Sequence, residues 1–315
     1  MAKKFAIMPD TTCDLSLEYQ KEYDIEVILG HYATPDGKEH ISFHSWEGID
    51  RDQFYKELKK DPDGFKTSPP NVQECKEAFL KHLEKGEGVL AMAISTGISG
   101  TYDFMTKAKE EIAKEHPEYE SQIKVIDSLR FGPGYGLMAV YAANLRKEGK
   151  SLEETTNWLE ENKNRFHQTG WMDDLSFVAK KGRLTHAKAF FGTLVGVKPV
   201  GEFDYNGLTT VIGKGKGEKQ TYKILIEYIA RHIINPEEQI IFIATTNRHK
   251  QAEVFKQMIE DRFHPKAVYV NDVYSNCSIN VGPGLMAAYY YGKPISKGLV
   301  EETAAFNDIV ANLGE

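Results

Sequence analysis

Short apolar runs alternate along the first half of the chain with longer segments in which apolar residues recur at helical spacing. Four of these runs have the length of buried strands: 5–8, 26–30, 88–94 and 123–127. The segments between them are long enough for crossover helices. Strands that alternate with helices indicate a mostly parallel sheet with helices on both faces. The pattern therefore predicts an α/β fold for this half.

Helix starts are marked by capping residues. Asn71 with Glu74 and Ser151 with Glu154 have the spacing of capping boxes. Phe104, Ala108 and Ile112 fall on one face of a helix that we expect to begin near Ser99. The similar stretches 132–141 and 282–291 place proline beside glycine before an apolar run, which predicts a helix start in both.

The second half combines hairpin and crossover patterns. Residues 199–213 alternate on both sides of Asn206-Gly207, which predicts a β-hairpin. Helices are expected at 219–233 and 247–261, and strands at 239–245 and 266–271. The polar stretch 162–170 ends in glycine and predicts a domain break. We therefore expect two α/β domains, 1–165 with a mostly parallel sheet and 166–315 with a mixed sheet.

Composition and charge narrow the class of protein. The chain has 315 residues and a formal net charge of −7, which argues against a nucleic-acid partner. No apolar run reaches the roughly 18 residues of a membrane span, and the first ten residues lack a signal-peptide core. Three widely spaced cysteines match neither a zinc site nor a disulfide framework. We expect a cytoplasmic protein with no stable membrane insertion.

Hydroxyl-bearing loops follow several predicted strands. Ser95, Thr96, Ser99 and Gly100 lie between the strand 88–94 and the next helix. Similar loops carry Asp10 and Thr11, Thr67, and Ser128. The carboxyl ends of parallel strands meet at one sheet edge, and helix N-termini there favour anions such as carboxylate or phosphate. The alternative interpretation is that these hydroxyls only cap helices and satisfy turns.

Catalytic and cofactor signatures are missing from the sequence. It contains no G-x-S-x-G or H-E-x-x-H motif, and the stretch 213–220 lacks the order of a P-loop. His31, His40 and His44 have no recognised metal-ligand spacing, and we interpret them as surface residues. We therefore expect a binding protein that is not an enzyme, with no cofactor and no metal.

The ordered motifs resemble the DegV family of bacterial fatty-acid-binding proteins. The stretches that carry the resemblance are DTTCDL (10–15), TSPP (67–70), ISTGISGTY (94–102), VIDS (125–128), VAKKGR (178–183), VKP (197–199) and NVGPG (280–284). The resemblance implies a long-chain fatty acid in a buried tunnel, presented to a separate fatty acid kinase. It also implies that the segment 280–291 returns to a ligand site between the domains.

The resemblance assigns roles to individual residues. It implies that the carboxylate is held by Thr67, Ser95, Thr96 and Asn280. Supporting loop positions are Asp10, Thr11, Ser99, Gly100, Ser128 and Gly282, and Arg183 is expected to face the kinase. Asn280 departs from the family, which has histidine there, and a neutral amide stabilises a carboxylate less than an imidazolium does.

Two further interpretations stay open at this point. The same anion site would suit a phosphoryl-transfer enzyme or a binder of a small phosphorylated metabolite, and a chain that has lost its ligand would act only as an interaction protein. Apolar residues near the motifs could line a tunnel or simply pack in the core: Ile94, Phe104, Met105, Phe190, Phe191 and Leu194.

Overall fold

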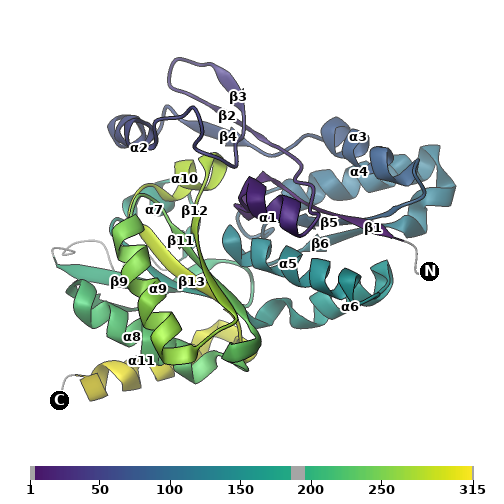
Figure 1. Ribbon diagram of the computed structural model, residues 1–315. Coiled ribbons are helices and arrows are strands. Elements are labelled where there is room, and N and C mark those ends of the chain that lie inside the picture. The colour runs from purple at the N-terminus through teal and green to yellow at the C-terminus, as the bar shows by residue number, and fades with distance from the viewer. Residues whose placement is uncertain (1–3, 186–195, 314–315) are drawn as a thin grey trace.

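Three β-sheets organise the computed structural model, which describes residues 4–185 and 196–313 (Figure 1). Two three-stranded sheets are built from residues before 165, and all strands of a seven-stranded sheet follow residue 165. The α/β class with a parallel sheet and a mixed sheet is thus confirmed. The domain limits 1–165 and 166–315 stay a prediction.

The parallel sheet has the order β1-β5-β6, from Phe5–Pro9, Gly88–Ala93 and Ile123–Asp127. One face packs against α3 (Val72–Leu83) and α4 (Thr101–Glu115). The other packs against α5 (Pro133–Lys147) and α6 (Leu152–Asn162), so that helices cover both faces as expected (Figure 1). Both predicted capping boxes are present, at Asn71 and Ser151.

The rest of this half includes a small antiparallel sheet of order β3-β2-β4, which lies above the parallel sheet in Figure 1. Its elements are α1 (Leu17–Glu22), β2 (His31–Ala33), β3 (Glu39–Ile41), α2 (Arg51–Lys60) and β4 (Lys66–Ser68). The strand expected at 26–30 is wrong. Isolated bridges pair Ile25 with Ile7 of β1 and Ile28 with Asp10, which follows β1, and no strand forms over 26–30.

The large sheet has the order β12-β11-β13-β7-β9-β10-β8. Its strands are β7 (Phe166–Met172), β8 (Leu184–Thr185), β9 (Val197–Phe203), β10 (Thr209–Lys216), β11 (Ile240–Thr245), β12 (Ala267–Asp272) and β13 (Leu285–Tyr291). The β11–β12 and β8–β10 pairs are parallel and the others antiparallel, so the sheet is mixed as expected.

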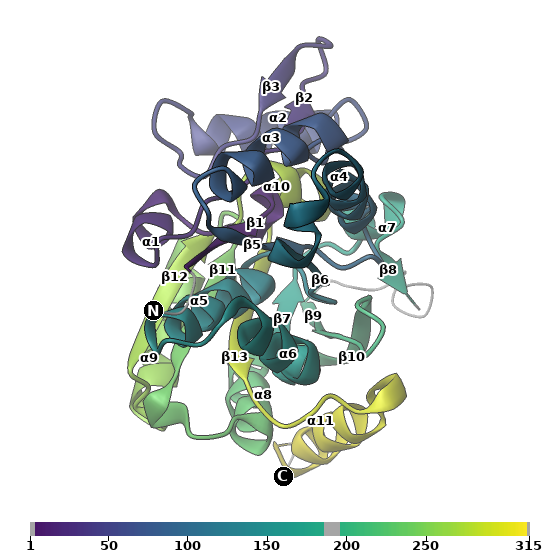
Figure 2. The same cartoon turned by 90° about the vertical axis from the view of Figure 1, so that its right-hand side faces the viewer.

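Helices α8 (Gly217–His232), α9 (His249–Phe263) and α11 (Val300–Leu313) cover one face of the large sheet (Figure 2). The opposite face turns toward α5 and the parallel sheet, and its apolar residues join the same core cluster as α5. The short helices α7 (Ser176–Lys180) and α10 (Ser275–Val281) lie near this junction. The described residues contain no helix of the length and hydropathy needed to cross a membrane.

Two local expectations fail for physical reasons. The helix expected within 282–291 is strand β13, which lies between β11 and β7 and is almost wholly buried. A central strand buried on both faces reads as a continuous apolar run, which periodicity alone cannot distinguish from a helix. His44 is buried, with 4% of its surface exposed, instead of lying at the surface.

Candidate functional site

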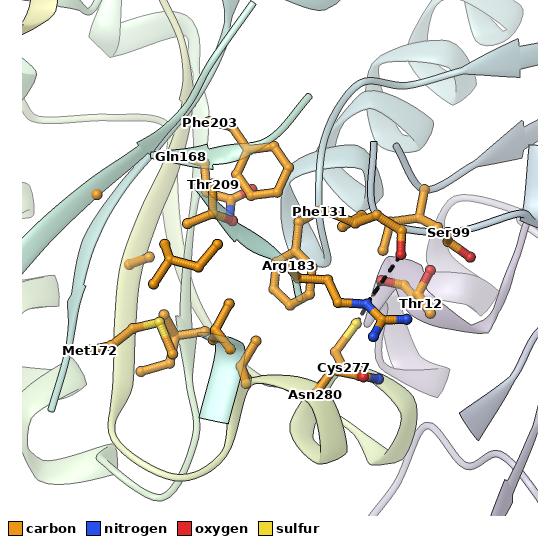
Figure 3. A pocket seen from close by; sticks show the side chains of 18 of the residues that line it. Thr12, Ser99, Phe131, Gln168, Met172, Arg183, Phe203, Thr209, Cys277 and Asn280 are labelled. Atoms are coloured by element: carbon orange, nitrogen blue, oxygen red, sulfur yellow. Dashed lines mark hydrogen bonds between the residues drawn. The ribbon is translucent and has the colours of Figure 1, made fainter. Parts of the chain in front are cut away.

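A cavity of about 220 Å³ lies between the large sheet and the loops at the carboxyl edge of the parallel sheet. Thr12, Thr67, Ser99, Arg183 and Asn280 contribute polar groups to its wall. Figure 3 shows four of them, Thr12, Ser99, Arg183 and Asn280, gathered on one side, with Met172 on the opposite side. The cavity therefore combines a polar end with an apolar interior.

Thr67 and Asn280 meet at the polar end. Thr67 lies on β4, and Asn280 lies on α10. The Asn280 Nδ2 donates to Thr67 Oγ1 at 3.1 Å and to the Asn276 carbonyl at 2.7 Å. Because Thr67 Oγ1 accepts this bond, its own hydroxyl hydrogen can be donated to a ligand oxygen. The amide thus orients a hydroxyl donor toward the cavity.

Arg183 is the cationic side chain among the described residues that line the cavity. It follows α7, and its Nε donates to the Ile98 carbonyl at 3.4 Å while Nη1 donates to the Lys181 carbonyl. In Figure 3 its guanidinium points toward Thr12 and Asn280. A guanidinium carries five N–H donors, so two bonds to carbonyls leave donors for an anion. Its expected role toward a kinase stays a prediction.

Ser95 and Thr96 do not line the cavity. Ser95 is fully buried, and its Oγ donates to the Gly207 carbonyl at 2.6 Å. Thr96 Oγ1 donates to Asp127 Oδ2 at 2.6 Å. These bonds hold the hairpin turn and the sheet edge in place. The contacts of both hydroxyls therefore fit the alternative interpretation, in which loop hydroxyls satisfy local turns. Head-group binding by these two residues stays a prediction.

The buried polar groups of the loops that follow β1 and β6 hold the sheet edge together. Asp10 accepts hydrogen bonds from the backbone N–H of Thr12 at 2.8 Å and of Ile94 at 3.1 Å. Burial raises the pKa of Asp10, although these hydrogen bonds oppose the shift. Thr11 Oγ1 contacts His44 Nε2, and Ser128 Oγ donates to the Arg130 carbonyl. None of the three, Asp10, Thr11 or Ser128, lines the cavity.

Of the remaining supporting positions, Ser99 and Gly100 line the cavity, and Gly282 shapes a turn. Ser99 and Gly100 line the cavity just before α4, close to the expected helix start. Ser99 Oγ accepts from the Thr101 N–H at 3.3 Å and lies 2.8 Å from Thr101 Oγ1. Gly282 has a φ of +72°, and a Cβ there would lie 2.4 Å from the Phe177 ring. Its glycine is required by the turn into β13.

Of the apolar candidates for a tunnel, Ile94 lines the cavity. Phe104 is 39% exposed on α4, and Met105 is buried in the core between the parallel sheet and its helices, so neither does. Phe190, Phe191 and Leu194 lie outside the described residues. The packing alternative therefore holds for Met105.

Sequence reasoning missed the wall that the large sheet supplies. Alternate residues of β7 and β9 face the cavity, as the twofold period of a strand requires. These are Gln168, Gly170, Met172, Pro199, Gly201 and Phe203. A Cβ on Gly201 would meet no atom closer than 3.4 Å, so this glycine leaves space in the cavity. Gly201, inside the predicted hairpin 199–213, was the available signal, whereas β7 was not predicted as a strand.

Arg130 is a second residue that sequence reasoning missed. It is fully buried beside the cavity wall formed by Phe131. Its guanidinium donates to the carbonyls of Leu129, Lys163 and Asp204 and to Asn164 Oδ1. Burial lowers its pKa to about 10. Arg130 thereby fastens the hairpin turn of the large sheet to the loop after β6.

The model of the DegV family, described as uncharacterised proteins, matches residues 4–293. The chain belongs to the DegV family. Among its relatives, a DegV domain-containing protein of Clostridium perfringens is 31% identical over 296 residues, which cover 92% of this chain and 98% of the relative. The resemblance found in the sequence is thus confirmed for this DegV chain.

Solved structures show the same fold as this DegV chain. One is a DegV family protein from Thermus thermophilus that binds fatty acid, which has a TM-score of 0.79 and 24% identity to this chain. It matches over 92% of this chain and 99% of its own. The fatty acid kinase B3 protein of Streptococcus pneumoniae, loaded with linoleic acid, has a TM-score of 0.77 and 18% identity over 91% and 99%.

Proposed function

We propose that this DegV-family chain binds a long-chain fatty acid, with the carboxylate at the polar end of the cavity and the acyl chain along the large sheet. The observation that carries the proposal is the meeting of Thr67, Asn280 and Arg183 at one end of an otherwise largely apolar cavity. The fatty acids bound by the similar solved structures support this ligand class.

The polar end suits a carboxylate because it offers donors and a positive charge. The Thr67 hydroxyl, oriented by Asn280, donates to one oxygen, and the Arg183 guanidinium lies on the same side of the cavity. Burying a carboxylate without such partners is unfavourable. Thr67 and Asn280 are therefore the head-group residues of the proposal, and Ser95 and Thr96 contribute by fixing the surrounding loops.

The apolar interior provides most of the affinity. Each buried methylene contributes about 0.8 kcal/mol, so a palmitoyl chain offers on the order of 10 kcal/mol before the cost of ordering it. Ile94, Phe131, Met172, Phe203 and Leu285 are apolar residues of the wall. Extension of the cavity to hold the whole chain is part of the proposal.

We further propose that the chain is a carrier that presents its ligand to a separate fatty acid kinase and is not itself an enzyme. The kinase protein B3 of Streptococcus pneumoniae, similar over most of its length, supports this role. The similar proteins give no support to a phosphorylated metabolite as the ligand. A cytoplasmic location is part of the proposal, in keeping with three free, buried cysteines.

Native mass spectrometry of protein expressed in bacteria tests the proposal. The expected spectrum contains the protein with a bound long-chain fatty acid, and added stearate displaces it. Thr67→Val should release the ligand more readily, while Ser121→Ala, which removes a hydroxyl at an exposed position, serves as the control. A protein that stays empty and ignores added stearate contradicts the proposal.

A further inference from the structure

One buried amide joins α10 to two segments from the first half of the chain. Asn276 lies on α10, lines the cavity and is 5% exposed. Its Oδ1 accepts a hydrogen bond from Ser42 Oγ at 2.6 Å, and its Nδ2 donates to the Ser68 carbonyl at 3.4 Å. Ser42 directly follows β3, and Ser68 ends β4. These partners lie 234 and 208 positions away in the chain, so the amide connects distant parts of the fold.

The partners of Asn276 fix the orientation of its amide. The Ser68 carbonyl can only accept a hydrogen bond, so it faces the amide nitrogen, and the amide oxygen is left for the Ser42 hydroxyl. The Ser42 N–H donates to the Gly30 carbonyl at 2.9 Å, which places Gly30 beside this contact. A Cβ on Gly30 would lie 2.7 Å from the Ser68 carbonyl oxygen and 3.3 Å from Asn276 Nδ2. The missing side chain of Gly30 therefore leaves the room in which the amide reaches Ser68.

Both ends of Asn276 lead to the polar end of the cavity. Ser68 follows Thr67 on β4, so the bond to its carbonyl restrains the backbone next to the Thr67 hydroxyl. The Asn276 carbonyl accepts from Asn280 Nδ2 at 2.7 Å, and the same Nδ2 donates to Thr67 Oγ1 at 3.1 Å. Asn276 is thus bonded through its side chain to the strand that carries Thr67, and through its backbone to the amide that orients Thr67.

Apolar packing alone does not fix the distance between these groups. Ile279 of α10 and Phe65, which precedes β4, belong to one core cluster. Such contacts are non-directional, whereas a hydrogen bond weakens steeply when its geometry departs from the optimum. The bonds of Asn276 therefore supply the directional restraint between α10 and β4.

We propose that Asn276 is a positioning residue of the head-group site, which keeps Thr67 within hydrogen-bonding distance of Asn280. This inference rests on the proposed function, in which the Thr67 hydroxyl donates to the ligand carboxylate. Asn276 acts through these two residues and not by its own contact with the carboxylate. Loss of its side chain should therefore weaken recognition of the carboxylate and leave the binding of the acyl chain almost unchanged.

The test compares myristate with tetradecanol, which has the same number of carbon atoms but no carboxylate. Isothermal titration measures the affinity of the full chain, stripped of endogenous lipid, for both ligands. Asn276→Ala should weaken myristate binding about three- to tenfold, the effect of one lost hydrogen bond, and tetradecanol binding by less than about twofold. The ratio of the two affinities is the readout, because a general loosening of the fold would lower both.

A second background separates an action through Thr67 from an independent effect. In a Thr67→Val chain, the hydroxyl that Asn276 positions is absent. Adding Asn276→Ala should then change the myristate affinity by less than about twofold, since mutations that act through one contact are not additive. Ser42→Ala, which removes only the donor to Asn276 Oδ1, should lower the same ratio by a smaller factor. It tests the proposal even if Asn276→Ala fails to fold.

Ser278→Ala is the matched control on the same helix. Ser278 is buried, and its Oγ donates to the Val273 carbonyl at 2.6 Å and lies 2.8 Å from the Tyr55 hydroxyl oxygen. This variant should lower the melting temperature and leave the ratio of the two affinities unchanged. The same loss of ratio in Ser278→Ala overturns the positioning role, because any loosening of α10 would then suffice.

The remaining outcomes separate this inference from the proposed function. An unchanged ratio in both Asn276→Ala and Ser42→Ala overturns the positioning role while the fatty acid site stands. A loss of myristate affinity by Asn276→Ala that is equally large in the Thr67→Val chain also overturns it. Failure of the unmodified chain to bind either ligand contradicts the proposed function itself.

Discussion

Asn280 and Thr67 are joined by a hydrogen bond of 3.1 Å, although 213 positions separate them in the chain. Asn280 is the donor, so the Thr67 hydroxyl keeps its hydrogen for another acceptor. Thr67→Val should therefore weaken fatty acid binding about tenfold, since a hydrogen bond to a charged group contributes about 1.5 to 3 kcal/mol. Isothermal titration with palmitate measures this change. An unchanged affinity removes Thr67 from the site.

Asn280→His should make binding depend on pH. A histidine at this position gains a positive charge below its ordinary pKa of about 6.5 and then stabilises a carboxylate more strongly. Palmitate should bind this variant more tightly at about pH 6 than at about pH 8, whereas the unmodified chain should show a smaller difference. Titrations of both chains at the two pH values provide the comparison. Identical pH dependence would count against a carboxylate beside Asn280.

Gly201 sets the space available to the acyl chain. A side chain there projects into the cavity, where a Cβ meets only ordinary contacts at 3.4 Å or more. Gly201→Leu should lower stearate affinity by about tenfold or more, because filling a packed site costs about 1 to 3 kcal/mol. Gly201→Ala should have a smaller effect. Octanoate and stearate losing affinity equally would show that the acyl chain does not pass Gly201.

Ser95→Ala tests whether Ser95 stabilises the fold or binds the ligand. The lost bond from Ser95 Oγ to the Gly207 carbonyl should reduce the free energy of unfolding by about 1 to 3 kcal/mol, because the carbonyl loses its partner in a buried place. Chemical denaturation measures this change, with Ser121→Ala at an exposed position as the control. Weaker palmitate binding at unchanged stability would instead place Ser95 at the head group.

His44 makes the stability of the protein sensitive to mild acid. Burial lowers the pKa of His44 below its unfolded value of about 6.5, so the unfolded chain binds the proton more readily. Its contribution to stability is therefore present above about pH 6.5 and decreases as the pH falls below it. His44→Gln should flatten the dependence of the melting temperature on pH in this range. His116→Gln, at an exposed helix end, should leave it unchanged.

Local signals in the sequence were sufficient for much of the fold. Asn71 and Ser151 start helices through contacts within four residues, and Asn206-Gly207 turns a hairpin whose strands pair locally. The strand β13 was missed because its burial comes from β11 and β7, which lie far away in the chain. His44 was misjudged for the same reason, since its partners at Thr11 and Leu15 are tertiary contacts.

The candidate site shows the same division. Thr67 and Asn280 were found through motifs, and the structure brings them into contact. Ser95 belongs to the same kind of hydroxyl loop, yet its Oγ bonds to the hairpin turn. Nothing local in the sequence distinguishes these two uses of a hydroxyl. Gln168 and Arg130 carry no motif, and only the packing of the two halves gives them their surroundings.

Arg130 constrains how a ligand enters or leaves the cavity. Its fully buried guanidinium donates to the Leu129 carbonyl, in the loop after β6, and to the Asp204 carbonyl, in the hairpin turn of the large sheet. Separating the two halves of the protein would remove the buried guanidinium from its hydrogen-bond acceptors. The ligand should therefore enter and leave through small local displacements of the cavity wall. The backbone amides around Arg130 should stay protected from hydrogen exchange while one ligand replaces another.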